Sequence, residues 1–96
     1  METLTTDSFI SKLRPFFDDV FPGVDVHLES LVPGRIGGYL IWEGFDGVHF
    51  RERQKRIWKV LRQHLSVNEQ ERITAILALT PNENNTFQRA KDKVAS

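Results

Sequence analysis

The sequence contains no cysteine, and this absence excludes several kinds of chemistry at once. Without a thiol, the 96-residue chain cannot form a disulfide, bind zinc through thiolates, hold an iron–sulfur cluster through cysteine or use a cysteine nucleophile. The sequence also lacks any uncharged apolar run near the roughly 18 residues that a transmembrane helix needs. We therefore expect a domain without disulfides, membrane spans or thiolate metal sites.

The first eleven residues lack the basic residues that open a secretory signal peptide, and they carry the acidic Glu2 and Asp7 instead. We therefore expect a soluble, cytoplasmic protein. The length is close to the commonest domain size of roughly 100 residues, which predicts one domain spanning residues 1–96. A hydrophobic content of 40% and ten aromatic residues are too apolar for a disordered chain.

The chain has no net charge, because 13 basic and 13 acidic side chains cancel. The two halves nevertheless differ. Residues 1–50 carry three bases and eight acids, a formal charge of −5, whereas residues 51–96 carry ten bases and five acids, a formal charge of +5. The bases concentrate at residues 51–62, where six of them accompany only Glu52. The sequence therefore predicts one positively charged face.

Apolar residues in the first segment recur with helical spacing, which predicts an amphipathic helix from Thr6 to about Val20. Either Thr6 or Asp7 can cap this helix. Pro15 lies inside the pattern and removes a hydrogen bond, so we expect a kink there or a break into two short pieces.

Apolar and polar residues alternate over residues 24–29, which predicts a half-buried strand. Residues 31–38 hold one proline and three glycines, so they are interpreted as a turn or flexible loop. A second strand is predicted over residues 39–42, antiparallel to the first because the connection is short. Residues 43–47 turn the chain again.

The strongest helical pattern runs from residue 49 to about residue 65. Its apolar arc comprises Phe50, Gln54, Ile57, Trp58, Val60, Leu61, His64 and Leu65. The opposite arc comprises Arg51, Lys55, Arg56, Lys59 and Arg62. The apolar arc is expected to face the core and the basic arc to face solvent.

Two capping boxes of the form S/T-x-x-E follow this helix. Ser66 with Glu69 predicts a short helical turn, and Thr80 with Glu83 predicts a terminal helix. Between them, residues 73–79 are apolar almost throughout and predict a third strand, central in the sheet.

The predicted order is α-β-β-α-α-β, followed by a C-terminal helical tail over residues 81–96. The compact solution is an α/β fold of the α+β type, a two-layer sandwich with the two long helices on one face of a three-stranded sheet. The tail has only three apolar residues on one face, so we expect it to dock loosely or fray.

Residues 40–83 resemble the BolA-like proteins. That family combines a strand ending in F-x-G, a basic helix with an arginine six residues beyond that glycine, and a last strand that contains h-x-A and closes with Thr-Pro. The corresponding residues here are Phe45, Gly47, Arg53, Ile57, Leu61, Leu65, Ile73, Ala75, Thr80 and Pro81. The segment VDVHLES also fits the family's opening, so the likeness covers most of the chain.

The resemblance implies a BolA-like fold, akin to the type II KH arrangement, and a non-enzymatic binding module that docks a protein partner. In the family this partner is a monothiol glutaredoxin, and the role is iron–sulfur trafficking or iron-linked regulation. The resemblance places the partner-binding surface around residues 31–38, with Arg35, Arg53, Gln54 and Thr74.

The chain departs from the family at the cluster ligands. Thr74 stands where the family has its histidine ligand, and residues 31–38 contain neither the cysteine nor the histidine that supplies the second ligand. A threonine hydroxyl is a poor ligand for cluster iron, which prefers thiolate or imidazole. We therefore expect a divergent member that binds no cofactor alone and does not share a 2Fe–2S cluster.

Residues 51–62 suggest an alternative function, a nucleic-acid-binding regulator. Arg51, Lys55, Lys59 and Arg62 would neutralise phosphates, and Trp58 would stack on a base. The same pattern is also typical of a solvated face on an amphipathic helix. A third possibility is a BolA-like domain with a partner of another kind.

The G-x-x-G at residues 34–37 matches the backbone clamp of KH domains. That clamp joins two helices, whereas this one lies between two predicted strands, so a flexible hairpin loop is the favoured interpretation.

Catalytic and metal-binding constellations are absent from the sequence. His27, His49 and His64 lack the spacing of metal ligands. No G-x-S-x-G motif or glycine-rich phosphate loop is present, and the only adjacent carboxylate pair is Asp18–Asp19. We therefore expect neither an enzyme nor a metal site.

Overall fold

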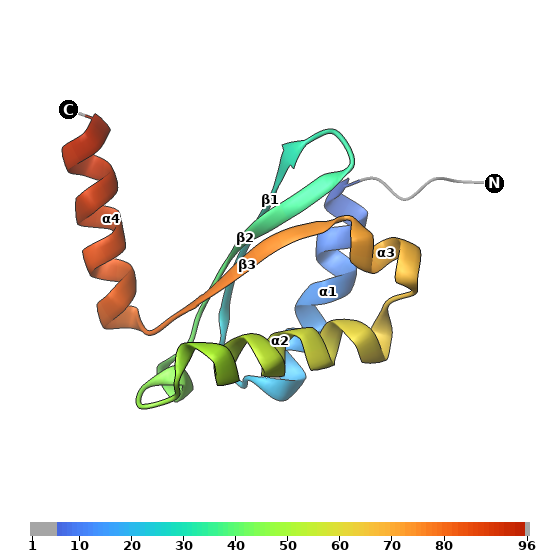
Figure 1. The fold of residues 1–96 in the computed structure, drawn as a ribbon, viewed down its shortest axis with the longest axis horizontal. Helices are drawn as coiled ribbons and strands as arrows, with labels where there is room; N and C mark the ends of the chain where they lie inside the picture. Colours follow the sequence, from blue (N-terminus) through green and yellow to red (C-terminus); the bar gives the residue numbers. More distant parts are fainter. Residues whose placement is uncertain (1–5, 96) are drawn as a thin grey trace.

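Over the residues that the structure describes, the chain forms a three-stranded sheet and four α-helices. The structure is a computed structural model that describes the backbone of residues 6–95 and the side chains of residues 8–30 and 32–89. Its elements are α1 (Thr6–Val20), β1 (Asp25–Val32), β2 (Arg35–Ile41), the short 3-10 helix η1 (Glu43–Phe45), α2 (Phe50–His64), α3 (Val67–Glu71), β3 (Ile73–Leu79) and α4 (Pro81–Ala95) (Figure 1). The α/β class and the order of the elements are confirmed.

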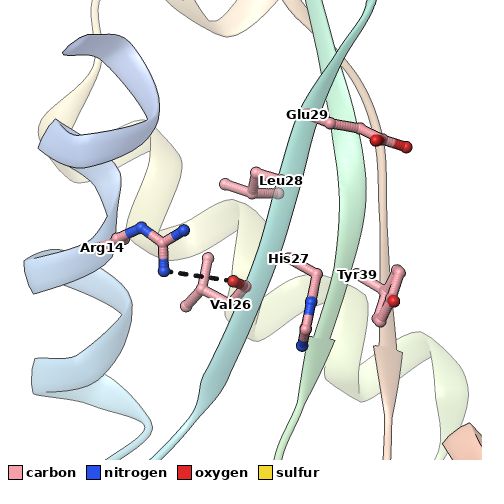
Figure 2. A pocket seen from close by; sticks show the side chains of 6 residues that line it. All are labelled: Arg14, Val26, His27, Leu28, Glu29 and Tyr39. Carbon is pink, nitrogen blue, oxygen red and sulfur yellow. Dashed lines mark hydrogen bonds between the residues drawn. The ribbon is translucent and has the colours of Figure 1, made fainter. Parts of the chain in front are cut away.

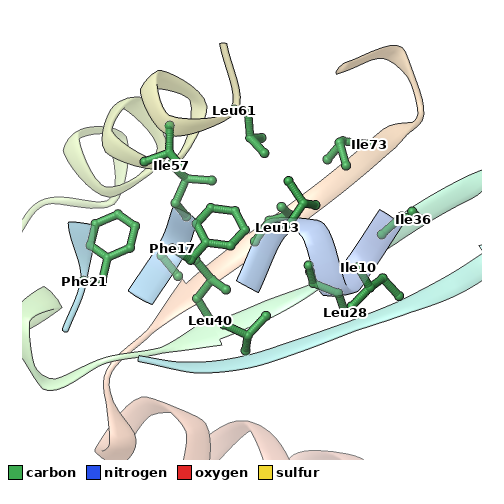
Figure 3. Close-up of a cluster of buried hydrophobic side chains, with 14 of the residues drawn as sticks. Ile10, Leu13, Phe17, Phe21, Leu28, Ile36, Leu40, Ile57, Leu61 and Ile73 are labelled. Carbon is green, nitrogen blue, oxygen red and sulfur yellow. The ribbon is translucent and has the colours of Figure 1, made fainter. Parts of the chain in front are cut away.

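The core lies between one face of the sheet and the helices α1 and α2 (Figure 3). Its largest fully buried side chains are Phe9, Leu13, Phe17, Phe21, Ile36, Leu40, Phe45, Ile57, Leu61 and Ile76. Full burial of each such side chain contributes roughly 1.5–3 kcal/mol. The packing of these three elements therefore fixes how α2 presents its outer surface.

β1 and β2 form a tight antiparallel hairpin, so the loop predicted over residues 31–38 is wrong. β1 continues to Val32, β2 begins at Arg35, and only Pro33 and Gly34 turn the chain. The prediction failed because the glycines that suggested a loop lie mainly inside β2.

Gly38 shows why β2 contains glycine. Its φ is 153°, and a Cβ at this position would lie 1.9 Å from the carbonyl oxygen of His27 on β1. Only a residue without a side chain allows the two strands to approach this closely.

β3 lies at the edge of the sheet, so its predicted central position is wrong. The strand order is β1-β2-β3, and β3 pairs in parallel with β2 alone. Its apolar sequence has another cause. Ile73, Ile76 and Ala78 are buried against the helices, whereas Leu77 remains 38% exposed.

Side chains from the helices bind carbonyl groups on both edge strands. On α1, Arg14 donates from Nη1 to a main-chain carbonyl of β1 over 3.3 Å. At the other edge, Gln54 donates to the carbonyl of Ile76 over 2.8 Å, and Arg53 donates to that of Ala78 over 3.0 Å. Unpaired edge groups can recruit a strand from another chain, so these donors protect the edges.

α1 is one continuous helix through Pro15, so the predicted break is wrong. Proline in a helix interior costs about 3 kcal/mol, but Leu13 and Phe17 on either side are fully buried and hold the helix in place. The cap predicted at Thr6 or Asp7 depends on side chains that lie outside the described residues.

α2 and α3 begin where the local sequence predicts. His49 caps α2, with Nδ1 accepting the N–H of Arg51 over 3.2 Å. The capping box of α3 is confirmed, because the Ser66 hydroxyl accepts the N–H of Glu69 over 3.2 Å and the Glu69 carboxylate accepts the N–H of Ser66 over 2.9 Å.

α4 begins at the second predicted capping box. The Thr80 hydroxyl accepts the N–H of Glu83 over 3.1 Å, and the Glu83 carboxylate accepts the N–H of Thr80 over 2.8 Å. These two bonds satisfy donors that every helix start leaves free.

α4 stands apart from the other helices (Figure 1) and contacts the sheet through Tyr39 of β2. The Phe87 ring meets the Tyr39 ring edge-on at 5.9 Å, and Gln88 donates to the Tyr39 hydroxyl over 3.3 Å. The other two residues of its apolar face, Ala90 and Val94, have side chains outside the described part.

Candidate functional site

The candidate site is a groove on the outer surface of α2, with a volume of about 350 Å³. We call it the α2 groove. Its lining residues are Phe50, Arg51, Gln54, Lys55, Trp58 and Arg62. Residues four apart lie one above the other on a helix, so Phe50, Gln54 and Trp58 form one row and Arg51 and Lys55 form the next.

Phe50 was predicted to face the core, but 56% of its surface is exposed. At this end of α2, Arg53 makes the interior contact instead, with its guanidinium 5.7 Å from the ring centroid of the buried Phe45. Phe50 is therefore left at the surface, where it forms one end of the α2 groove.

Arg53 is only 8% exposed, although it was predicted to bind a partner. Nε donates to the carbonyl of Val48 over 2.8 Å, and Nη1 donates to that of Ala78. Nη1 and Nη2 also contact the two carboxylate oxygens of Glu83 at 2.6 and 3.3 Å. These bonds use the guanidinium to join α2 to β3 and the start of α4.

The four predicted partner-binding residues lie in two separate places. Arg35 and Thr74 are exposed at one end of the sheet, near the hairpin turn and the end of α3, where Arg35 donates to the carbonyl of Glu71. Arg53 and the half-buried Gln54 contact β3 farther along the strand.

The residues predicted to bind nucleic acid are closer to one another. Arg51, Lys55, Trp58 and Arg62 all line the α2 groove, whereas the exposed Lys59 does not. Phe50 belongs to neither of the two sites predicted from the sequence. Its spacing could have identified it, because Phe50 precedes Gln54 by four residues and Trp58 by eight, which places all three on one face of a helix.

The second concave region straddles the edge strand β1 and has a volume of about 290 Å³. Figure 2 shows Arg14 and Leu28 on the α1 side, with His27 and Tyr39 on the other side of the sheet. The His27 ring stacks on Tyr39 at 4.7 Å, and its Nε2 lies 2.8 Å from the Asp25 carboxylate. These groups do not converge on one enclosed volume, so the region offers no catalytic arrangement.

The other two histidines have structural contacts. His49 caps α2, and the His64 ring stacks on Phe16 with centroids 3.9 Å apart. Within the described part of the chain, no three His, Cys, Asp or Glu side chains gather closely enough to hold a metal ion. Thr74, which the resemblance aligned with a histidine ligand, is an exposed strand residue.

Two glutamates have perturbed acidity, and both belong to capping boxes. The Arg53 guanidinium and the Thr80 N–H donate to Glu83 and hold the pKa of its carboxyl below the ordinary value. The Ser66 N–H and the Lys12 ammonium do the same for the pKa of Glu69. These shifts report structural contacts, since neither carboxylate lines the α2 groove.

The described helices include none with the length and apolar character that crossing a membrane requires. Compared with protein-family models, curated proteins and solved structures, the chain matches none of them.

Proposed function

We propose that this chain is a non-enzymatic, BolA-like binding module that docks a protein partner, such as a monothiol glutaredoxin, in iron-linked regulation. The observation that carries the proposal is the α2 groove, in which the exposed Phe50 and the half-buried Trp58 lie among three cations. Aromatic residues and arginine are enriched at the centres of protein interfaces.

The residues that carry the family resemblance have structural roles, which supports this assignment of the binding surface. Phe45 is fully buried, Gly47 has a φ of 75°, and Thr80 caps α4. Arg53 is bonded inside the chain. These residues are therefore occupied within the fold, whereas the side chains that line the α2 groove include exposed cations that a partner can reach. The proposal includes no cluster ligand from Thr74.

The test is size-exclusion chromatography of the chain mixed with a purified monothiol glutaredoxin, with and without cluster precursors. We expect a heterocomplex with the wild-type chain. It should be lost in the variant Lys55→Glu/Arg62→Glu and kept in Arg56→Glu/Lys59→Glu. The control makes the same charge change at exposed positions of α2 that do not line the groove. The absence of any complex with the wild-type chain would refute glutaredoxin docking.

A second candidate function is nucleic-acid binding, which the convergence of Arg51, Lys55 and Arg62 around Trp58 favours. Each phosphate contact with a single strand contributes about −0.7 to the slope of log affinity against log salt. Titrating a labelled dT15 oligonucleotide should then give a steep slope that Lys55→Glu/Arg62→Glu reduces by about two thirds, since it removes two of the three cations. Flat salt dependence, or no binding at low salt, would exclude this function.

A further inference from the structure

We infer that the α2 groove receives a short acidic segment of a partner protein that carries one or two large apolar side chains. This inference rests on the proposed protein-docking function, because it names the chemistry of the partner. Three features support it: the aromatic residues of the groove, cations that have no ion pair among the described side chains, and the charge of the rest of the surface.

The floor of the groove sets the spacing of the apolar anchors. Phe50 and Trp58 are eight residues apart on α2, which is about 12 Å along the axis at about 1.5 Å per residue. Two turns of a partner helix, or about four residues of extended chain, span the same distance. An apolar side chain that covers Phe50 would remove from water a ring that is 56% exposed in the free chain.

The cations of the groove are available to a ligand. Lys12 and Arg53 each pair with a glutamate, but Arg51, Lys55 and Arg62 form no ion pair with any carboxylate among the described side chains. No carboxylate lines the groove either. Partner carboxylates would therefore meet three cations without displacing an internal partner.

The charge elsewhere on the molecule favours a short acidic segment over a long polyanion. The chain has no net charge and a pI of 6.8, whereas domains that bind nucleic acid typically have a pI above about 9. Exposed carboxylates such as Asp18, Asp19 and Asp46 would repel an anion that extends beyond the groove. At physiological salt the Debye length is about 8 Å, so a short segment senses mainly the cations it touches.

The test is selection of a random dodecapeptide phage library against the wild-type chain, followed by fluorescence anisotropy with the strongest selected peptide. We expect the selected peptides to combine Asp or Glu with one or two aromatic or leucine residues. Lys55→Glu/Arg62→Glu should weaken binding by at least about tenfold, and Phe50→Ala should weaken it by about fivefold. Arg56→Glu/Lys59→Glu is the matched control and should stay within about twofold of wild type.

Three results would overturn the inference: no enrichment of acidic peptides, equal weakening by the control variant, or displacement of the peptide by dT15 at a lower concentration than unlabelled peptide. The last result would assign the groove to nucleic acid. Circular dichroism of each variant is the control that tests whether its fold is kept. A glutaredoxin complex that survives Lys55→Glu/Arg62→Glu would leave the proposed function standing and refute this inference. Binding of an acidic peptide to the groove without any glutaredoxin complex would refute glutaredoxin docking and leave this inference standing.

Discussion

At the scale of single residues, the chain places unusual demands on Gly38 and Arg53. Gly38 accommodates the carbonyl of His27 at a distance that no Cβ tolerates. Arg53 is a charged side chain in an almost fully buried position, where its N–H groups bind two carbonyls and one carboxylate. Both residues were assigned other roles from the sequence, as part of a loop and as part of a partner surface.

Substitution of Gly38 by alanine should destabilise the protein by more than about 3 kcal/mol, because the added Cβ forces the two strands apart. Gly34 provides a matched control. Its φ is 80° and a Cβ there meets nothing within 4 Å, so Gly34→Ala should cost only about 1–2 kcal/mol. Urea unfolding monitored by Trp fluorescence measures the free energy of unfolding of both variants. Equal losses would contradict the close-approach argument.

Substitution of Arg53 by alanine should cost about 3 kcal/mol, because it leaves the Ala78 carbonyl and the Glu83 carboxylate without their partner. Arg56→Ala, at an exposed position on the same helix, should change the free energy of unfolding by less than about 0.5 kcal/mol. A loss for Arg53→Ala no greater than that of Arg56→Ala would show that the buried guanidinium contributes little to stability.

At the scale of elements, the local sequence sets where helices begin, and long-range contacts then reinforce those signals. The capping box of α4 is the clearest case. The Glu83 carboxylate accepts one hydrogen bond from Thr80, three residues earlier, and another from Arg53, thirty residues earlier. The cap is local, whereas the ion pair needs the folded chain.

The lowered pKa of Glu83 predicts a pH dependence of stability. Because the folded-state pKa lies below the ordinary value of 4.5, the ionised carboxylate stabilises the fold above pH 4.5, and this contribution is lost as the pH falls through the folded-state pKa. Glu83→Gln removes the titrating group, so its stability should fall less steeply than that of wild type below pH 4.5. The side chain is 46% exposed, so added salt should reduce the difference.

Urea unfolding at neutral pH and at several values below pH 4.5 measures this effect. Glu43→Gln is a suitable control, because that carboxylate has no ion pair with a described cation. Identical acid dependence in Glu83→Gln and wild type would show that the Arg53–Glu83 contact does not govern the response.

At the scale of the whole molecule, a small mixed sheet with two open edges is protected by side chains from the helices on its covered face. Arg14 acts at the β1 edge, and Arg53 and Gln54 act at the β3 edge. The same residue of α2, Gln54, thus protects the β3 edge and lines the α2 groove beside its cations.

Removing one donor at each edge, in Arg14→Thr/Gln54→Thr, should increase self-association through strand pairing. Light scattering and thioflavin fluorescence during incubation measure the rate of aggregation. We expect this rate to be severalfold higher in the variant than in wild type. Arg56→Thr/Lys59→Thr removes two exposed cations from α2 and tests whether reduced charge alone has this effect. Equal rates in the two double variants would attribute the change to charge and not to the edges.

Local sequence patterns were enough to predict the helices and both capping boxes, because these depend on contacts within a few residues. The third strand was predicted from its apolar run, which marks a buried segment. Helical periodicity predicted α1 with the observed bounds and α2 to within one residue at each end, and the apolar run predicted β3. Alternation predicted β1 only in part, since the strand continues to Val32.

The hairpin, the strand order and the set of residues that form the site became clear only from the folded chain. The glycines of β2 are explained by the neighbouring strand, the edge position of β3 by its single pairing partner, and the burial of Arg53 by its bonds to Ala78 and Glu83, which lie 25 and 30 residues away. Each of these depends on residues distant in the chain, and local patterns carry no information about which distant segment a residue will meet.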